Sequence, residues 1–480
     1  MLKLLTIIGA RPQIIKAAAI SRVVREKYAG QIEEHILHTG QHYDENMSEV
    51  FIRELGIPEP EYNLHVGSGS HGVQTARIIE GVESVLLRER VSELGNEGVS
   101  ELANEGVRGY DGVIVYGDTN STLAAAVAAA KINVPVFHIE AGLRSFNMAM
   151  PEEQNRIVCD ALSSVLFAPT ETALKNLERE GVSDSRISEL GISDSRISEL
   201  GNEGVSELGI SELGISELGI SDSRISELGN ERLAVRRFAN GKGQKVVLSG
   251  DVMYDNALYF SAMADMKSDI IERLGLTYKG FVLATIHRPA NTDNPENLKS
   301  IFRALADIAA SGVDVVLPLH PRTRKRIREL GIRELGVSEL GVSELGVSEL
   351  GIRELGIREL GDEGVGCTVY GVQNERLRII DPVSFFEIIR LERKARVVLT
   401  DSGGVQKEAF FYGTPSVILR PETEWVEIVD AGAGILAGAD YERIMAAYKE
   451  LSGREVKFPP LFGDGKASEK ILSEIVKYLR

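Results

Sequence analysis

The sequence predicts an α/β fold built from two doubly wound domains, each with a parallel sheet. Short apolar segments alternate with helical segments along most of the chain, which is the pattern of parallel strands joined by crossover helices. Nearly every apolar segment is followed by glycine or charged residues, as at the strand ends where ligands bind in such folds. At 480 residues, of which 43% are hydrophobic and 26% charged, the chain is long enough for two or three domains.

Six apolar segments predict the strands of a first domain at residues 1–249. They are 2–8, 34–39, 112–116, 134–139, 164–168 and 245–249. Five further segments predict the strands of a second domain at 250–480, namely 281–285, 314–319, 377–380, 396–400 and 416–419. Helices are expected between the strands, for example at 121–131 and 296–310. The final helix is expected to pack back on the first domain.

Three low-complexity insertions interrupt this alternation, at 91–109, 183–232 and 331–365. They repeat five-residue units such as ISELG, VSELG and IRELG. A period of five advances a helical position by about 140° per repeat and changes the face of a strand at every repeat, so neither element gains an apolar side. We therefore expect surface loops. A small pentapeptide-type solenoid is the alternative, although its usual inward-facing pattern is met only loosely.

The net charge of −17 is concentrated in the insertions. Acidic residues exceed basic ones by 3 in 91–109, by 7 in 183–232 and by 5 in 331–365, which leaves −2 for the rest of the chain. Global charge therefore gives no argument about an anionic partner.

Cys159 and Cys367 are far apart and favour neither a disulfide framework nor a zinc site. No apolar run suits a membrane span or a signal peptide, so we expect a cytoplasmic protein.

The loops after the first-domain strands carry acidic groups and one lysine. The segment 9–16, GARPQIIK, is a tight turn that enters a helix, and its Arg11 and Lys16 suit an anion. Asp118, Glu140 and Glu152 follow later strands, and Glu140 stands directly after an apolar segment. Burial there would raise its pKa and suit proton abstraction from carbon. Helix capping is the simpler interpretation, above all for Asp118.

The second-domain loops are typical of anion binding. The segment 401–408, DSGGVQKE, follows an apolar strand and opens a helix, whose free N–H groups and Ser402 can hold a diphosphate. Glu408 can accept the hydroxyls of a ribose, and Arg420 can pair with phosphate. His287 with Arg288, and His320 with Arg322, end two neighbouring strands. A strand-end histidine is often structural, but two His/Arg pairs favour a role in binding anions.

Outside the three insertions, the chain resembles the non-hydrolysing UDP-N-acetylglucosamine 2-epimerases. The resemblance is carried in order by GARPQIIK, TGQHYDENM, YGDTNSTLA, HIEAGLRS, MPEEQNR, FAPTE, HRPANTDN, HPRT, DSGGVQKEA and LRPETEW. It implies a GT-B fold with two Rossmann-like domains facing a cleft. It also implies an isomerase that eliminates UDP to form a 2-acetamidoglucal and adds it back with inverted C2, without metal or nicotinamide cofactor.

The resemblance assigns roles residue by residue. UDP-sugar-binding positions are matched by Arg11, His287, Ser402, Gly403, Gly404, Glu408 and Arg420. Catalytic positions are matched by Lys16, Asp118, Glu140, Glu152 and His287. Which carboxylate removes the C2 proton is left open. The expected partners are the UDP-sugar and a second copy of the chain as a homodimer, with no nucleic acid and no membrane, and the expected role is the supply of sugars for surface polysaccharide.

The chain departs from the family pattern at several positions. Gln13 stands where glutamate is usual, and Trp425 where many members have arginine. Asp44 and Val73 stand where bacterial members carry glutamine and arginine of an activator site for UDP-N-acetylglucosamine. The segments GDVMYD and ETEWVE are similar to the branch that acts on UDP-2,3-diacetamido-2,3-dideoxyglucuronic acid. The simple UDP-N-acetylglucosamine substrate is favoured, with that acid as the alternative.

Three other functions compete with this interpretation. A hydrolysing epimerase would use similar residues but release free N-acetylmannosamine. A GT-B glycosyltransferase would bind a UDP-sugar yet need an acceptor site in place of several carboxylates near C2. A non-catalytic scaffold would use the repeats as its binding element. It would lose its function when the repeats are deleted and keep it when every carboxylate is neutralised.

Overall fold

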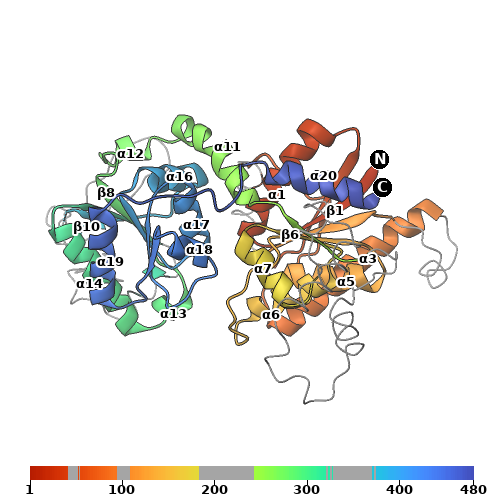
Figure 1. Ribbon diagram of the computed structural model, residues 1–480, viewed down its shortest axis with the longest axis horizontal. Helices are drawn as coiled ribbons and strands as arrows, with labels where there is room; N and C mark the ends of the chain where they lie inside the picture. The colour runs from red at the N-terminus through yellow and green to blue at the C-terminus, as the bar shows by residue number, and fades with distance from the viewer. Residues whose placement is uncertain are drawn as a thin grey trace, which may run out of the picture. The chain divides into compact units, whose positions relative to one another are not determined.

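The computed structural model describes residues 1–41, 52, 55–94, 109–182, 243–319, 323–324, 327, 370–371 and 375–480. Its contacts divide the chain into two compact units (Figure 1). Unit 1 comprises Met1–Asp255 and Leu461–Arg480, and unit 2 comprises Asn256–Pro460. Each unit holds one seven-stranded sheet, so the predicted α/β fold with two parallel sheets is confirmed.

The sheet of unit 1 has the strand order β3-β2-β1-β4-β5-β6-β7, with all neighbours parallel. The order reverses between β1 and β4, and the loops after these strands diverge there to form the usual ligand position of a doubly wound sheet. The strands are β1 (Leu2–Ile8), β2 (Ile32–His38), β3 (Tyr62–Asn63), β4 (Gly112–Tyr116), β5 (Val136–Ile139), β6 (Val165–Ala168) and β7 (Lys245–Leu248).

Helices cover both faces of this sheet. On one face the alanines of α5 bring it close to α3 and to the strands, because small side chains allow a close approach. On the other face α20 packs against α1 (Figure 1). Tyr478 of α20 meets the ring of Phe137 edge-on. The helices of unit 1 are α1 (Arg11–Val23), the π-helical turn η1 (Val24–Tyr28), α3 (His71–Leu94), α5 (Asn120–Lys131), α6 (Pro151–Leu162), α7 (Glu171–Arg179) and α20 (Ala467–Leu479).

The sheet of unit 2 has the order β10-β11-β9-β8-β12-β13-β14, parallel except for the antiparallel edge strand β10. Its order reverses between β8 and β12, which makes the loops after these two strands the corresponding ligand position. The strands are β8 (Phe281–Thr285), β9 (Asp314–Pro318), β10 (Tyr370–Gly371), β11 (Leu377–Ile380), β12 (Val397–Thr400), β13 (Ser416–Ile418) and β14 (Gly434–Leu436).

Alternation along β8 sorts its side chains between two cores. Val282 and Ala284 pack with α14 and α19, whereas Phe281 and Leu283 pack with α12 and α16. The helices beyond unit 1 are α11 (Val252–Lys267), which begins in unit 1, α12 (Ile270–Arg273), α13 (Pro289–Thr292), α14 (Pro295–Ala310), α16 (Phe385–Lys394), α17 (Gly403–Phe411), α18 (Val426–Asp430) and α19 (Tyr441–Gly453).

The chain leaves unit 1 and returns to it at two segments that bind each other. Asp251 N donates to Phe462 O at 3.0 Å, and the carboxylate of Asp255 accepts from the backbone N–H groups of Ala467 and Ser468 at the start of α20. Gly250 has φ +81°, and a Cβ there would lie 3.0 Å from Phe462 O. These contacts fix α20 in unit 1.

All eleven strand segments that the sequence predicts are strands in the structure, with bounds that differ by at most two residues. The short strands β3, β10 and β14 at or near the sheet edges were not predicted, because two or three residues give too little alternation to read. Residues 91–94 continue α3, which corrects the expectation that the whole tract 91–109 is a loop; the first glycine of that tract stands at 95. Residues 95–108 and the insertions 183–232 and 331–365 lie outside the described residues.

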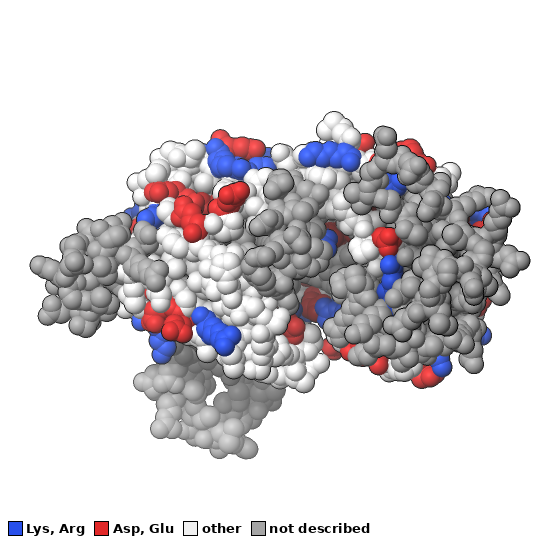
Figure 2. Space-filling view, turned by 180° about the vertical axis from the view of Figure 1, so that it is seen from behind, with Lys and Arg blue, Asp and Glu red and all other residues white. Residues whose placement is uncertain are grey.

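Positive and negative side chains of the described residues are interspersed on the face shown in Figure 2. The described residues visible there therefore form no continuous patch of one sign, in keeping with the near-neutral balance outside the insertions. None of the helices in the described ranges is long and apolar enough to cross a membrane.

Candidate active site

In unit 1 the turns after β1 and β4 are bound together by Gln13. Its Oε1 accepts from Gly9 N at 2.9 Å and Ala10 N at 3.1 Å, while its Nε2 donates to Tyr116 O at 3.1 Å and Thr122 Oγ1 at 3.0 Å. An ionised glutamate could not donate to the Tyr116 carbonyl. The departure from the family pattern at this position therefore suits the local geometry. These contacts of Gln13 hold the start of α1 beside the turn after β4.

Lys16 and Glu140 form an ion pair where this turn meets the end of β5. The Nζ to Oε1 distance is 2.8 Å, and the side chains are only 9% and 11% exposed. Gly117 follows β4, and a Cβ on it would lie 3.1 Å from Lys16 Nζ and 3.7 Å from Glu140 Oε1. The structure thus brings Lys16, Glu140 and the turn that carries Asp118 to one edge of the sheet.

Glu140 adopts a backbone conformation that L-residues avoid. Its φ of +71° lies in the left-handed region, which costs a non-glycine residue on the order of 1 to 3 kcal/mol. Such conformations persist where the surroundings over-determine them, and they cluster at functional sites. The conformation supports the assignment of Glu140 to the site.

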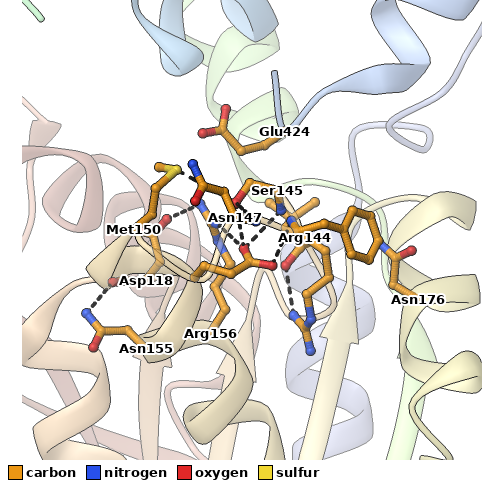
Figure 3. A network of polar contacts seen from close by, with 12 residues as sticks. Asp118, Arg144, Ser145, Asn147, Met150, Asn155, Arg156, Asn176 and Glu424 are labelled. Carbon is orange, nitrogen blue, oxygen red and sulfur yellow. Dashed lines mark hydrogen bonds and ion pairs between the residues drawn. The ribbon is translucent and has the colours of Figure 1, made fainter. Parts of the chain in front are cut away.

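Asp118 is held by α6. Arg156 of α6 pairs with the Asp118 carboxylate, and Asn155 Nδ2 donates to the Asp118 carbonyl at 2.9 Å (Figure 3). The Asp118 side chain remains 30% exposed. Thr119, not Asp118, caps α5 by accepting from Thr122 N. The capping interpretation of Asp118 is therefore wrong, because the next residue performs that role.

The adjacent glutamates at the start of α6 differ in their surroundings. Glu153 is buried and accepts from Ser145 N, Phe146 N and Arg156 Nη1, so it fixes the loop before α6. Glu152 is exposed. The prediction from the sequence includes Glu152 but not Glu153, Arg156 or Asp160. Their i, i+3, i+7 spacing on one helical face was the signal that could have found them.

In unit 2, buried Asp401 connects the loops after β8 and β12. Its carboxylate accepts from His287 N at 3.1 Å, Arg288 N at 3.1 Å and Asn291 Nδ2 at 3.1 Å. The His287 ring lies on the same carboxylate, with Nδ1 3.3 Å from Oδ1, and its side chain is 47% exposed. Asp401 is therefore the residue that orients His287 at the switch point of the sheet.

The N-terminus of α17 begins immediately after Asp401. Ser402 caps it by accepting from Val405 N. Neither Gly403 nor Gly404 has positive φ, and a Cβ on either would lie no closer than 3.5 Å to any atom of the described residues. Neither their conformation nor their packing against the described residues explains glycine at these two helical positions, where it costs up to roughly 1 kcal/mol relative to alanine. Close approach of a ligand to the helix N-terminus would explain both.

Arg420, which follows β13, is buried and paired with Glu424. Its Nη1 and Nη2 both donate to that carboxylate at 2.9 Å. Burial alone would raise the pKa of Glu424, but the arginine lowers it below its ordinary value. Trp425 is also buried, with Lys407 Nζ 4.1 Å from its ring centroid. The Arg420 guanidinium is thus present at the strand end but already holds one carboxylate.

Three further residues that the sequence analysis names differ in their exposure. Arg11 is exposed at the start of α1, Val73 is exposed on α3, and Glu408 is partly buried on α17. Asp44, His320, Arg322 and Cys367 lie outside the described residues. Cys159 is buried in the core of unit 1, as expected for a small packing residue. Among the described residues, no group of three or more His, Cys, Asp or Glu side chains could hold a metal ion.

Comparison with known proteins shows the family of the chain. A family model described as UDP-N-acetylglucosamine 2-epimerase matches residues 25–94, 100–202 and 226–476. The chain is 38% identical to UDP-2,3-diacetamido-2,3-dideoxy-D-glucuronate 2-epimerase of Pseudomonas aeruginosa, over 99% of this chain and 100% of that one. It is 34% identical to UDP-N-acetylglucosamine 2-epimerase of Methanocaldococcus jannaschii, over 98% of each.

A solved structure shows the same fold. The crystal structure of the Methanocaldococcus jannaschii UDP-GlcNAc 2-epimerase in complex with UDP-GlcNAc and UDP matches with a TM-score of 0.69 and 32% identity, over 99% of this chain and 100% of that chain. The fold and these relatives place the protein in the class of nucleotide-sugar isomerases. It belongs to the UDP-N-acetylglucosamine 2-epimerase family.

Proposed function

We propose that this protein interconverts UDP-N-acetylglucosamine and UDP-N-acetylmannosamine by eliminating UDP and adding it back. The observation that carries the proposal is the buried Lys16–Glu140 pair beside the Gly117 turn, at the switch point of the unit 1 sheet. In the forward half-reaction a carboxylate takes the C2 proton, the C1–O bond to UDP breaks, and a C1=C2 double bond forms. The reverse steps on the other face of C2 give the epimer, with no net oxidation.

In this proposal the two units divide the work. Asp118, Glu140 and Glu152 supply the acid and base, and Lys16 offsets the charge that Glu140 carries while protons move at C2. His287, Ser402, Gly403, Gly404 and Arg420 take the diphosphate, with Arg11 as a further cation and Glu408 on the ribose hydroxyls. The helix N-terminus and His287 would stabilise the charge that develops on the departing UDP.

The cations beside the unit 1 carboxylates do not choose between the two candidate sugars. Lys16 pairs with Glu140, Arg156 with Asp118 and Glu153, and Arg144 with Asp160. Each is paired with a protein carboxylate, but so is Arg420, to which the proposal gives the diphosphate. Pairing alone therefore excludes none of them from binding a uronic acid. The second candidate is UDP-2,3-diacetamido-2,3-dideoxyglucuronic acid, which the printed name of the relative with 38% identity favours.

The test is incubation with each UDP-sugar in heavy water, followed by NMR of the C2 proton. Elimination and re-addition predict deuterium at C2 of both epimers, with free UDP only as a minor product. Retention of the C2 hydrogen after many turnovers would overturn the mechanism. Release of free N-acetylmannosamine would establish the hydrolysing alternative. Faster exchange with the diacetamido acid would reassign the substrate.

The Glu140→Gln variant links this reaction to the site. Its turnover should fall by orders of magnitude while UDP affinity stays nearly unchanged, because the lost interaction belongs to proton transfer and not to nucleotide binding. Epimerisation at the parent rate by this variant would remove Glu140 from the mechanism.

We further propose that the protein works as a cytoplasmic homodimer and supplies sugars for surface polysaccharide. The resemblance to the family supports this. Light scattering on the purified chain tests the dimer, and fractionation of cells tests the location. A monomer at working concentration, or protein in the membrane fraction, would contradict the respective part.

A further inference from the structure

The His138 ring is buried within β5, two residues before Glu140, and has a hydrogen-bond partner on each nitrogen. Nδ1 lies 2.7 Å from Asp160 Oδ1, and Nε2 lies 2.8 Å from Gly117 O. A carbonyl oxygen only accepts, and so does a carboxylate, so both ring nitrogens must donate. The ring is therefore an imidazolium. Burial alone would lower the pKa of His138, but contact with Cys159 and Asp160 raises it well above its ordinary value.

Asp160 continues the network to the loop after Glu140. Its Oδ2 accepts from Gly142 N at 3.1 Å and from Arg144 Nη2 at 2.7 Å. Arg144 in turn makes two contacts of 2.7 Å with the carboxylate of Glu180. The side chains of His138, Asp160 and Arg144 are at most 2% exposed. Three buried charged groups and the partly exposed Glu180 thus form one chain of ion pairs in unit 1.

The network ends on the backbone of both turns that carry candidate catalytic carboxylates. His138 binds the carbonyl of Gly117, which directly precedes Asp118, and Asp160 binds the N–H of Gly142, two residues after Glu140. Gly117 and Gly142 have φ of +64° and +79°. Buried ion pairs contribute little net stability compared with well-packed apolar groups. A positional role accounts for their presence here better than stability does.

We propose that His138 is a positioning residue, a permanently charged bridge that fixes the Gly117 turn and, through Asp160, the Gly142 turn. It thereby sets the place of Asp118 relative to Glu140. The proposal rests on the proposed epimerase function for its kinetic consequence, but the charge and contacts of the ring do not depend on it. In this role His138 itself does not contact the substrate.

Two substitutions separate the contacts of the ring. His138→Gln places an amide nitrogen near the position of Nε2 and can still donate to Gly117 O. His138→Asn places its amide nitrogen near Nδ1 and keeps only the contact with Asp160. If the Gly117 contact positions Asp118, the Asn variant should lose about 100-fold in kcat, as a misplacement of about 1 Å can cause. The Gln variant should stay within about tenfold of the parent.

KM and UDP affinity should remain within about threefold for both variants, because nucleotide binding is not the step affected. The matched control is Val136→Ala, a buried residue of the same strand outside the network. Its thermal stability should fall while its kcat stays near the parent value. Equal kcat losses in the Gln and Asn variants, or losses that follow thermal stability in all three, would overturn the positioning role.

NMR of the parent protein with 15N-labelled histidine tests the charge without any activity. His38 is the internal control, since its Nδ1 accepts from Gly40 N at 3.0 Å and its ring is therefore neutral. The His138 signals, assigned by their loss in the Gln variant, should be those of an imidazolium at pH 8, and those of His38 should be neutral. A neutral His138 would overturn the proposal. An inactive parent with a charged His138 would count against the epimerase function alone.

Discussion

Lys16 on α1 and Glu140 at the end of β5 are joined by an ion pair of 2.8 Å with both side chains about nine-tenths buried. Removing one partner of a buried pair leaves a charge without compensation, which typically costs roughly 3 to 5 kcal/mol. We predict that Lys16→Met lowers the free energy of unfolding by about that amount, and that adding Glu140→Gln recovers part of it. Chemical denaturation of the single and double variants measures the coupling. Strictly additive losses would contradict the pair.

Substitution of Gly403 or Gly404 by alanine should weaken UDP binding without lowering the stability of the fold. Alanine at either position should leave the stability unchanged or raise it by up to about 1 kcal/mol, because helix propensity improves and no atom is in the way. UDP affinity should nevertheless fall about tenfold or more, since the new methyl group would occupy space needed by the diphosphate. Titration calorimetry with UDP and thermal melts measure both effects.

Gly453→Ala is the control for this prediction. Gly453 ends α19 in the same unit, has no atom within 4 Å of an added Cβ and does not have positive φ. Its substitution should change neither UDP affinity nor folding appreciably. Unchanged UDP affinity in the Gly403 and Gly404 variants would move the diphosphate away from the start of α17.

Substitutions of Arg420 and of Glu424 should have different effects on UDP binding and on stability. Arg420→Lys keeps the charge but loses the planar fork, so we expect UDP affinity to fall about tenfold. Glu424→Gln removes the competing carboxylate, so it should lower thermal stability without weakening UDP binding. Calorimetric titration with UDP compares the two. Weaker binding in the Gln variant alone would show that Glu424, not Arg420, contacts the ligand.

Glu153 predicts an acid-sensitive contribution to stability. Burial alone would raise its pKa, but N–H groups of Ser145 and Phe146 and the Arg156 side chain lower it below its ordinary value of 4.5. A carboxyl group with a lowered pKa in the folded state stabilises that state above the unfolded pKa, and the contribution is lost as pH falls through the folded value. Glu153→Gln should therefore be less stable than the parent at pH 7. The stabilities of the two proteins should approach each other as the pH falls below 4.5 and through the lowered pKa of the folded state, and a constant difference would contradict this.

Shortening the insertions tests their role. Because the entropy of loop closure grows only with the logarithm of length, replacing 183–232 and 331–365 by short loops should leave folding and turnover largely intact. Circular dichroism and the heavy-water assay measure the two properties. Insoluble or inactive protein from either deletion would make that segment structural.

The strands and the chemistry of the loops followed from the sequence because both are local properties. Apolar runs predicted eleven strands, and the motif 401–408 placed Ser402 at a helix start, where the structure has it. Lys16, Asp118 and Glu140 can be predicted because each stands in the segment that follows an apolar strand, and parallel strands bring their carboxyl ends to one edge of the sheet. Family motifs added the roles of these residues, since chemistry in a loop depends on residue type and order.

Tertiary structure alone decided which side chains pair. The helical spacing of Glu153 with Arg156 and Asp160 places them on one face of α6 but does not say that this face is the buried one. Nothing local indicates that Arg420 would bind Glu424, or that His138 would be charged between Gly117 and Asp160. Each outcome depends on groups that meet through the packing of α6, β5 and the strand-end turns, and on the loss of water when they meet. Electrostatic contacts are stronger in a buried site than in water, so the charge state and the partner of a side chain depend on which groups lie close to it. The residue type alone does not determine those distances.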